Sequence, residues 1–235
     1  MRSLLGFLAF IAVVIALVVA FVVPSIVAPM VAAAVREASP FGDQPLDVEV
    51  DVDAIGLLRG FVSEIRISGA DLADQDVRIG DLAITVQGLR LDDRSFSAIE
   101  GGLRSVAVPL GGAEPLVVDR ISLSGVSDTV NATVQLDHAA TLAFVNRTFA
   151  DQGVEVRDIE LIDGGISVVI FEQRVPLAFA VADGALVIAD LLGTGPMELM
   201  APLPDDPWHL IAVTATLAGM EIVASVDATR FLAGE

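Results

Sequence analysis

The hydrophobic positions in the middle of the chain recur at every second residue. Leu46, Val48, Val50 and Val52 alternate with four acidic residues, and side chains two residues apart lie on the same face of a β-strand. This segment therefore predicts a strand with one buried apolar face and one acidic face in water. Gly88 interrupts a later strand of this kind and shifts its apolar phase, as a β-bulge does.

Alternation or short apolar runs predict further strands along the rest of the chain. They cover residues 64–67, 82–86, 103–109, 116–124, 129–136, 153–162, 165–172, 175–182, 185–190, 208–218 and 220–227. Turn signals separate them, at Gly101-Gly102, Gly111-Gly112, Asp163-Gly164 and Asp183-Gly184, and the last two predict hairpins. Residues 196–200 predict one short helical turn.

The strands predicted within residues 165–190 are apolar on both faces. Such strands need a cover on both sides, because neither face can be left in water. A helix, a second sheet or a bound ligand would each provide it. On pattern alone, a filled sandwich core with a helix as its lid accounts for these strands as well as a ligand does.

One segment has helical periodicity instead. Leu142, Val145 and Phe149 follow one another at intervals of three and four residues, the spacing of one helix face. Asp137 is a suitable N-cap and Gly153 a suitable residue to follow the helix end. We therefore expect a helix between these two residues.

The amino-terminal segment is apolar over the length of a membrane span. Leu4 to Val23 is a run of twenty residues without a charged or polar side chain, which as a helix would span about 30 Å, the thickness of the bilayer hydrocarbon. The apolar region of a cleavable signal peptide is shorter, about 7–15 residues. We expect an uncleaved signal anchor. A cleaved signal peptide, with Ala32-Ala33-Ala34 near its cleavage site, and a buried core helix are the alternatives.

These features divide the chain into three parts. Residues 1–37 form a membrane anchor and a short helix, residues 38–45 a tether, and residues 46–235 a β-rich domain. Arg2 and the terminal amine favour a cytoplasmic amino terminus. We therefore expect a single-pass protein of the cell membrane with its domain on the extracytoplasmic side.

The charge of the chain excludes one class of partner. Its formal net charge is −19, and all 13 basic residues are arginine. From residue 36 onward, 12 arginines stand against 32 acidic residues, a net charge of −20. A surface this acidic repels phosphate backbones, so we expect no nucleic-acid binding. The absence of cysteine excludes disulfides, thiolate metal sites and cysteine nucleophiles.

The sequence nominates no catalytic chemistry. Its two histidines, His138 and His209, are too few for a histidine-rich zinc site, and no HExxH, GxSxG or phosphate-binding loop occurs. The acidic ladder of residues 47–53 lacks the glycine of a calcium-binding loop and indicates a solvated strand face. We expect Trp208 in the core. We also expect no catalytic residue, no metal and no cofactor.

In the order of its elements the chain resembles the LmeA-like phospholipid-binding family of cell-envelope proteins. The resemblance rests on the apolar amino-terminal segment ending near Ala34-Val35-Arg36-Glu37, on Leu57-Leu58-Arg59-Gly60, on residues 79–89, on the helix 137–152, and on the hairpin at Asp183-Gly184-Ala185-Leu186. It implies an elongated, curved sheet wrapped on a helix, similar to tubular lipid-binding domains. It also implies a role in binding or moving envelope phospholipid or glycolipid.

The fold class expected is therefore α+β and mostly β, with an amino-terminal transmembrane helix and a curved antiparallel sheet packed on one main helix. The leading hypothesis is a membrane-anchored, extracytoplasmic lipid-binding or lipid-transfer protein whose acyl chains lie against the helix and the carboxy-terminal strands. The candidate lining residues are Leu142, Val145, Phe149, Phe171, Phe179, Ile188, Ile211 and Val213. The alternatives are an anchored structural or interaction β-sandwich with a filled core, and an envelope enzyme. Protein partners stay open.

Overall fold

The computed structural model describes residues 46–52, 56, 59–73, 77–93, 95–108, 115–154, 157–170, 172–189, 196–203 and 205–233. The predicted anchor and tether, over residues 1–37 and 38–45, lie outside the described residues, as do Gly111-Gly112 and Phe171. Within the described ranges, no helix has the length and apolar character needed to cross a membrane.

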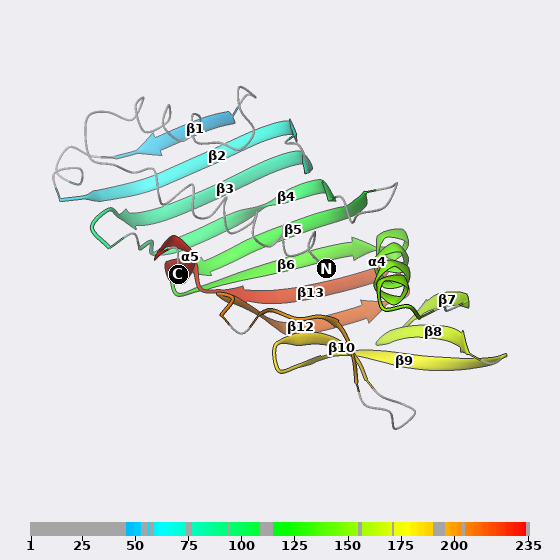
Figure 1. Ribbon diagram of the computed structural model, residues 1–235. Coiled ribbons are helices and arrows are strands. Elements are labelled where there is room, and N and C mark those ends of the chain that lie inside the picture. Colours follow the sequence, from blue (N-terminus) through cyan, green and yellow to red (C-terminus); the bar gives the residue numbers. More distant parts are fainter. Residues whose placement is uncertain are drawn as a thin grey trace.

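The described part of the chain is mostly antiparallel β-structure, as expected. Its strands form two sheets where one was expected (Figure 1). The large sheet has eight strands in the order β1 (Leu46–Asp51), β2 (Phe61–Ala73), β3 (Arg78–Arg90), β4 (Ala98–Val108), β5 (Leu116–Val126), β6 (Thr129–Asp137), β13 (Gly219–Val226) and β12 (Trp208–Thr216). The small sheet has five, in the order β11 (Met197–Met200), β10 (Ala185–Ile188), β9 (Gln173–Ala182), β8 (Gly165–Ile170) and β7 (Arg157–Ile162). The described ranges contain the helices α4 (His138–Asp151) and α5 (Ala228–Ala233).

The apolar phase changes within β2 and β3 without any change of register. Val62 pairs with Leu89, and Ile65 pairs with Val86. All four side chains are buried, although the two on each strand are three positions apart and would ordinarily lie on opposite faces. Gly88 has a φ of +61° at this point, a conformation that glycine adopts readily. The predicted phase shift at Gly88 is thus confirmed, but it is not a bulge, because the two strands change phase together.

A second line of phase changes crosses the sheet from β2 to β5. Asp71 and Ser105 lie on it with φ of +52°, left-handed backbone that is uncommon for residues with a Cβ. Beyond this line the next apolar row is again buried, and it consists of Leu72, Ile79, Val106 and Val118. Paired changes of this kind keep apolar side chains on one face along the whole length of the strands.

Gly101 and Gly102 lie in the middle of β4, so the turn predicted there is wrong. A Cβ on Gly101 would stand 2.2 Å from the carbonyl oxygen of Ala83 on β3. A Cβ on Gly102 would stand 2.2 Å from the carbonyl oxygen of Ile121 on β5. The glycine pair therefore marks a close approach of three backbones rather than a chain reversal.

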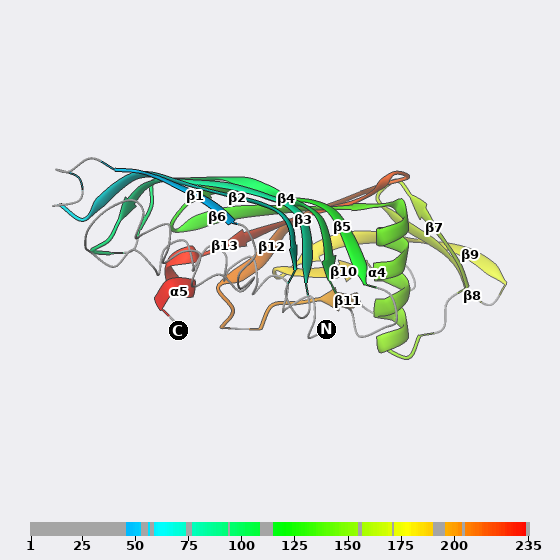
Figure 2. The ribbon, with the colours of Figure 1, turned by 90° about the horizontal axis from the view of Figure 1, so that it is seen from above.

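The helix α4 begins and ends where the sequence predicts. The Asp137 carboxylate accepts a hydrogen bond of 2.7 Å from the backbone N–H of Ala140, and Gly153 follows the helix with a φ of +73°. Its buried residues are Ala140, Thr141, Phe144, Val145, Thr148 and Phe149. The helix packs across β5, β6 and β13 and also contacts β7 (Figure 2).

The two predicted hairpins are confirmed, and their turns attach the small sheet to β12. Asp163-Gly164 joins β7 to β8, and Asp183-Gly184 joins β9 to β10. The Gly164 N–H donates to the Ala215 carbonyl at 2.9 Å, and the Leu210 N–H donates to the Gly184 carbonyl at 2.9 Å. The small sheet consequently packs against the last strand of the large one.

The rest of the small sheet differs in part from expectation. The described side chains of β8 and β10 are almost all buried, as strands apolar on both faces should be, but β9 exposes several of its positions. Residues 197–200 form the strand β11, so the helical turn predicted there is wrong. Pairing with β10 and the burial of Leu199 determine the conformation of this short segment.

The close approach at Gly102 makes this residue a sharp test of the sheet. We expect Gly102→Ala to lower the free energy of unfolding by about 1–3 kcal/mol, the usual cost of forcing atoms into a packed site. The backbone of Gly102 is not left-handed, so the effect is steric. Urea unfolding of the full chain in detergent micelles can be followed by the fluorescence of buried Trp208, the only tryptophan.

Gly69→Ala is the matched control. A Cβ on Gly69 would meet only the ends of the Leu46 and Leu72 side chains, at 3.0 Å, and flexible side chains can move aside. Equal destabilisation by the two substitutions would contradict the proposed collision with backbone.

The N-cap of α4 gives a second stability prediction. Asp137→Ala removes the acceptor of the Ala140 N–H and should lower the free energy of unfolding by about 1 kcal/mol. The same fluorescence assay measures it. Asn146→Ala, at an exposed position of the same helix, is the control and should leave stability unchanged or slightly higher, because alanine is the better helix former. A loss at Asn146 equal to that at Asp137 would rule out the capping explanation.

Candidate functional site

Three adjacent rows of residues cross all eight strands of the large sheet without a polar side chain. The first row is Val48, Ile67, Ile84, Gly101, Leu123, Ala132, Ala224 and Leu210. The second is Val50, Ile65, Val86, Ile99, Gly125, Val130, Val226 and Trp208. The third is Leu46, Gly69, Leu82, Leu103, Ile121, Val134, Ile222 and Val213. We call this surface the apolar face.

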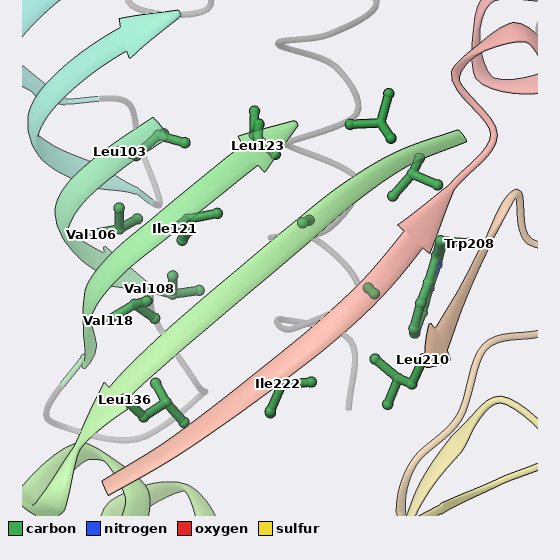
Figure 3. Packing of buried hydrophobic residues seen from close by; sticks show 14 of the residues in the cluster. Leu103, Val106, Val108, Val118, Ile121, Leu123, Leu136, Trp208, Leu210 and Ile222 are labelled. Atoms are coloured by element: carbon green, nitrogen blue, oxygen red, sulfur yellow. The ribbon is translucent and has the colours of Figure 1, made fainter. Parts of the chain in front are cut away.

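The apolar face is long as well as continuous. Neighbouring strands lie about 4.8 Å apart, so each row of eight positions extends about 34 Å. The side chains that it places on β1–β4 are at most 7% exposed, apart from half-buried Val50. Figure 3 shows part of the cluster of buried hydrophobic residues to which these side chains belong, with side chains from β4, β5, β6, β13 and β12 on the large sheet.

The described helix and small sheet pack on one half of the apolar face. The helix α4 lies against β5, β6 and β13, and strands of the small sheet lie against β12. Over β1 to β4, none of the helices and strands in the described ranges packs extensively on the face. Over β1–β4 the apolar side chains are almost all buried, and the lining residues predicted from the sequence lie at the other end of the domain.

The opposite face of the sheet is charged. Asp47, Glu49 and Asp51 project from β1 between the apolar positions, and the Glu49 carboxylate accepts a hydrogen bond from Arg66 on β2 at 3.4 Å. Arg66 also forms a salt bridge with Glu64. The described part of the acidic ladder is thus a solvent-facing strand face, as predicted, while Asp53 lies outside the described residues. The sheet separates an apolar surface from a charged one.

The predicted lining residues lie at the packed end of the domain. Val145 and Phe149 of α4 are buried and Leu142 is partly buried. Phe179 on β9 and Ile188 on β10 are buried in the small sheet and pair with each other. These residues belong to one hydrophobic cluster with the large sheet.

Ile211 lies at a register shift in β12, and Val213 follows it. The shift falls between Leu210 and Ala212, so Ile211 is the additional residue and is 47% exposed. Val213 returns to the inner side and is partly buried against the core. A bulge reverses the side on which the following residues lie, and no turn residue in the sequence signals this one.

The polar residues singled out in the sequence have structural roles. Trp208 is 4% exposed, which confirms its place in the core. The Nδ1 atom of His138 lies 2.9 Å from the carbonyl oxygen of Leu217, so this nitrogen must carry the proton if it bonds there. No group of three or more histidine and carboxylate side chains within the described part of the chain is arranged to hold a metal ion.

Among the described residues, the carboxyl groups with a shifted pKa are those of Asp92 and Asp93, in the turn between β3 and β4. A hydrogen bond from Arg90 lowers the pKa of Asp92, and hydrogen bonds from Ser95 lower the pKa of Asp93. Both residues lie in the turn that follows β3 and are exposed. Their shifts reflect the local structure of this turn.

Comparisons of this chain with protein-family models, with curated proteins and with solved structures find no match. The chemistry of the two faces of the large sheet is therefore the observation that bears on function.

Proposed function

We propose that this protein is a membrane-anchored, extracytoplasmic protein of the cell envelope that binds or transfers lipid, without enzymatic activity. The observation that supports the proposal most strongly is the apolar face. Its three rows contain no polar side chain over eight strands, and within the described ranges no helix or strand packs extensively over β1–β4. The resemblance in element order to the LmeA-like phospholipid-binding family favours the same function.

Acyl chains would lie along the β1–β4 half of the apolar face. Each CH₂ group that moves from water to this surface contributes about 0.8 kcal/mol. At about 4.8 Å between strands, β1 to β4 extend about 14 Å across the sheet, close to half of the roughly 30 Å hydrocarbon thickness of a bilayer, which is the depth of one acyl chain. In this arrangement the sheet would form one wall around the lipid, with its strands bending toward their ends (Figure 2), and the lipid head group would stay in water at an edge.

The charge of the domain determines how the protein would reach lipid. With a net charge of −20 from residue 36 onward, it would be repelled by anionic lipid, since electrostatic adsorption needs basic clusters. The amino-terminal segment would therefore hold the domain at the membrane, and the apolar face would do the binding. Phospholipid or glycolipid is the expected ligand class.

A filled-core interaction module is the second candidate. The tight packing of α4 and the small sheet on β5, β6, β13 and β12 favours it for that half of the domain. The two candidates differ over β1–β4, where a lipid-binding protein needs an accessible apolar surface and an interaction module needs a permanently filled core.

Site-specific photocrosslinking separates the two candidates. The amino acid p-benzoylphenylalanine replaces Ile84 on the apolar face, and in a matched control it replaces Gln87 on the same strand, which is exposed on the other face. With the full chain in its membrane, illumination should attach lipid to position 84 and none, or several-fold less, to position 87. Mass spectrometry of the crosslinked protein identifies the adducts.

Crosslinks at position 84 that reach only the protein's own chain would support the filled core and overturn lipid binding. Equal lipid labelling at 84 and 87 would mean nonspecific contact with the bilayer, and it would also count against the proposal.

A further inference from the structure

The charged face of the large sheet contains an open groove over β1–β5. Its volume is about 860 Å³, within the size range of small-molecule sites. The side chains Ser68, Ala83 and Ser122 line it together with Gly102, and these four residues are register neighbours on β2 to β5. Because these side chains are the smallest available, the sheet surface is hollow along this row.

Two arginines stand at one side of the groove. Arg104 on β4 and Arg120 on β5 are directly opposite each other in the register, line the groove and are exposed. Side chains in such cross-strand pairs have Cβ atoms about 4.5–5.5 Å apart, and like charges at this position destabilise a sheet. The two guanidinium groups can therefore reach one common anion.

Four of the other described arginines have a carboxylate partner. Arg66 pairs with Glu64, Arg90 with Asp92, Arg147 with Asp151 and Arg174 with Glu160. Among the salt bridges of the described residues, none involves Arg104 or Arg120, although Asp81 faces Arg104 across the register and lines the same groove. Two arginines opposite each other without a salt bridge are thus placed beside the groove in a domain with a large excess of carboxylates.

We propose that this groove binds a phosphate ester, with the phosphate between Arg104 and Arg120. Guanidinium groups bind phosphate oxygens through charge-assisted hydrogen bonds, often two at a time. The hydroxyls of Ser68 and Ser122 and the carboxylates of Asp47 and Asp81 also line the groove, and they suit the hydroxyl groups of a sugar or polyol attached to that phosphate. The polar side chains of the site lie on the face opposite the proposed lipid surface, and the groove also borders Leu82, Leu103 and Ile121 of the third apolar row.

Calorimetric titration of the full chain, held in phosphatidylcholine nanodiscs, tests the site with inorganic phosphate and with glucose 6-phosphate. Both should bind at constant ionic strength, the ester more tightly, while glucose alone should not. Arg104→Gln and Arg120→Gln should each weaken binding about tenfold or more, as expected for the loss of charge-assisted contacts. Arg78→Gln, which removes an exposed arginine outside the groove, should leave the affinity unchanged.

Nanodiscs that contain phosphatidylglycerol distinguish the source of the phosphate. If the natural ligand is a lipid head group, they should compete with glucose 6-phosphate in the unsubstituted protein and not in Arg104→Gln; if it is a free ester, they should have no effect. Absence of binding by both soluble probes, or equal weakening by Arg78→Gln, would overturn the site. Photocrosslinking at position 84 should not respond to these substitutions, so either proposal can fail without the other.

Discussion

The structure depends on keeping the apolar side chains of eight strands on one face of the large sheet. A β-strand alternates its side chains, so a single unpaired shift moves every later residue to the other face. In β2 and β3 this is avoided because both strands change phase opposite each other, at Ser63 and Gly88. In β12 one bulge at Ile211 is enough, because it realigns Val213 and Ala215 with β13.

This constraint produces two surfaces with different chemistry. The apolar face contains three uninterrupted rows, and the opposite face contains the acidic ladder of β1 and the groove beside Arg104 and Arg120. Only the backbone separates them. A hydrocarbon ligand and a phosphate ligand would therefore meet different side chains.

Alternation predicted most strands because burial on a single face imposes a period of two on the sequence. It failed at Gly101-Gly102, where glycine signals close backbone approach as readily as a turn, and at residues 196–200, where pairing with β10 makes a strand of a segment without clear periodicity. The candidate lipid-lining residues were taken from the most apolar strands, but those strands and α4 pack on one another. Which apolar surfaces are covered by the described helix α4 and the small sheet depends on contacts between distant segments, and no local pattern contains these contacts.

By itself, the sequence determined the mostly β character of the domain, the inner and outer side of most strands, the caps of α4 and the acidic outer surface, because each of these depends on neighbours a few residues away. The tertiary structure decided the order of the strands. β6 pairs with β13, although α4 and the whole small sheet lie between them in the chain, and only this pairing extends the apolar rows from β1 to β12. It also decided that Arg104 and Arg120 stand side by side, since their proximity depends on the register of β4 and β5.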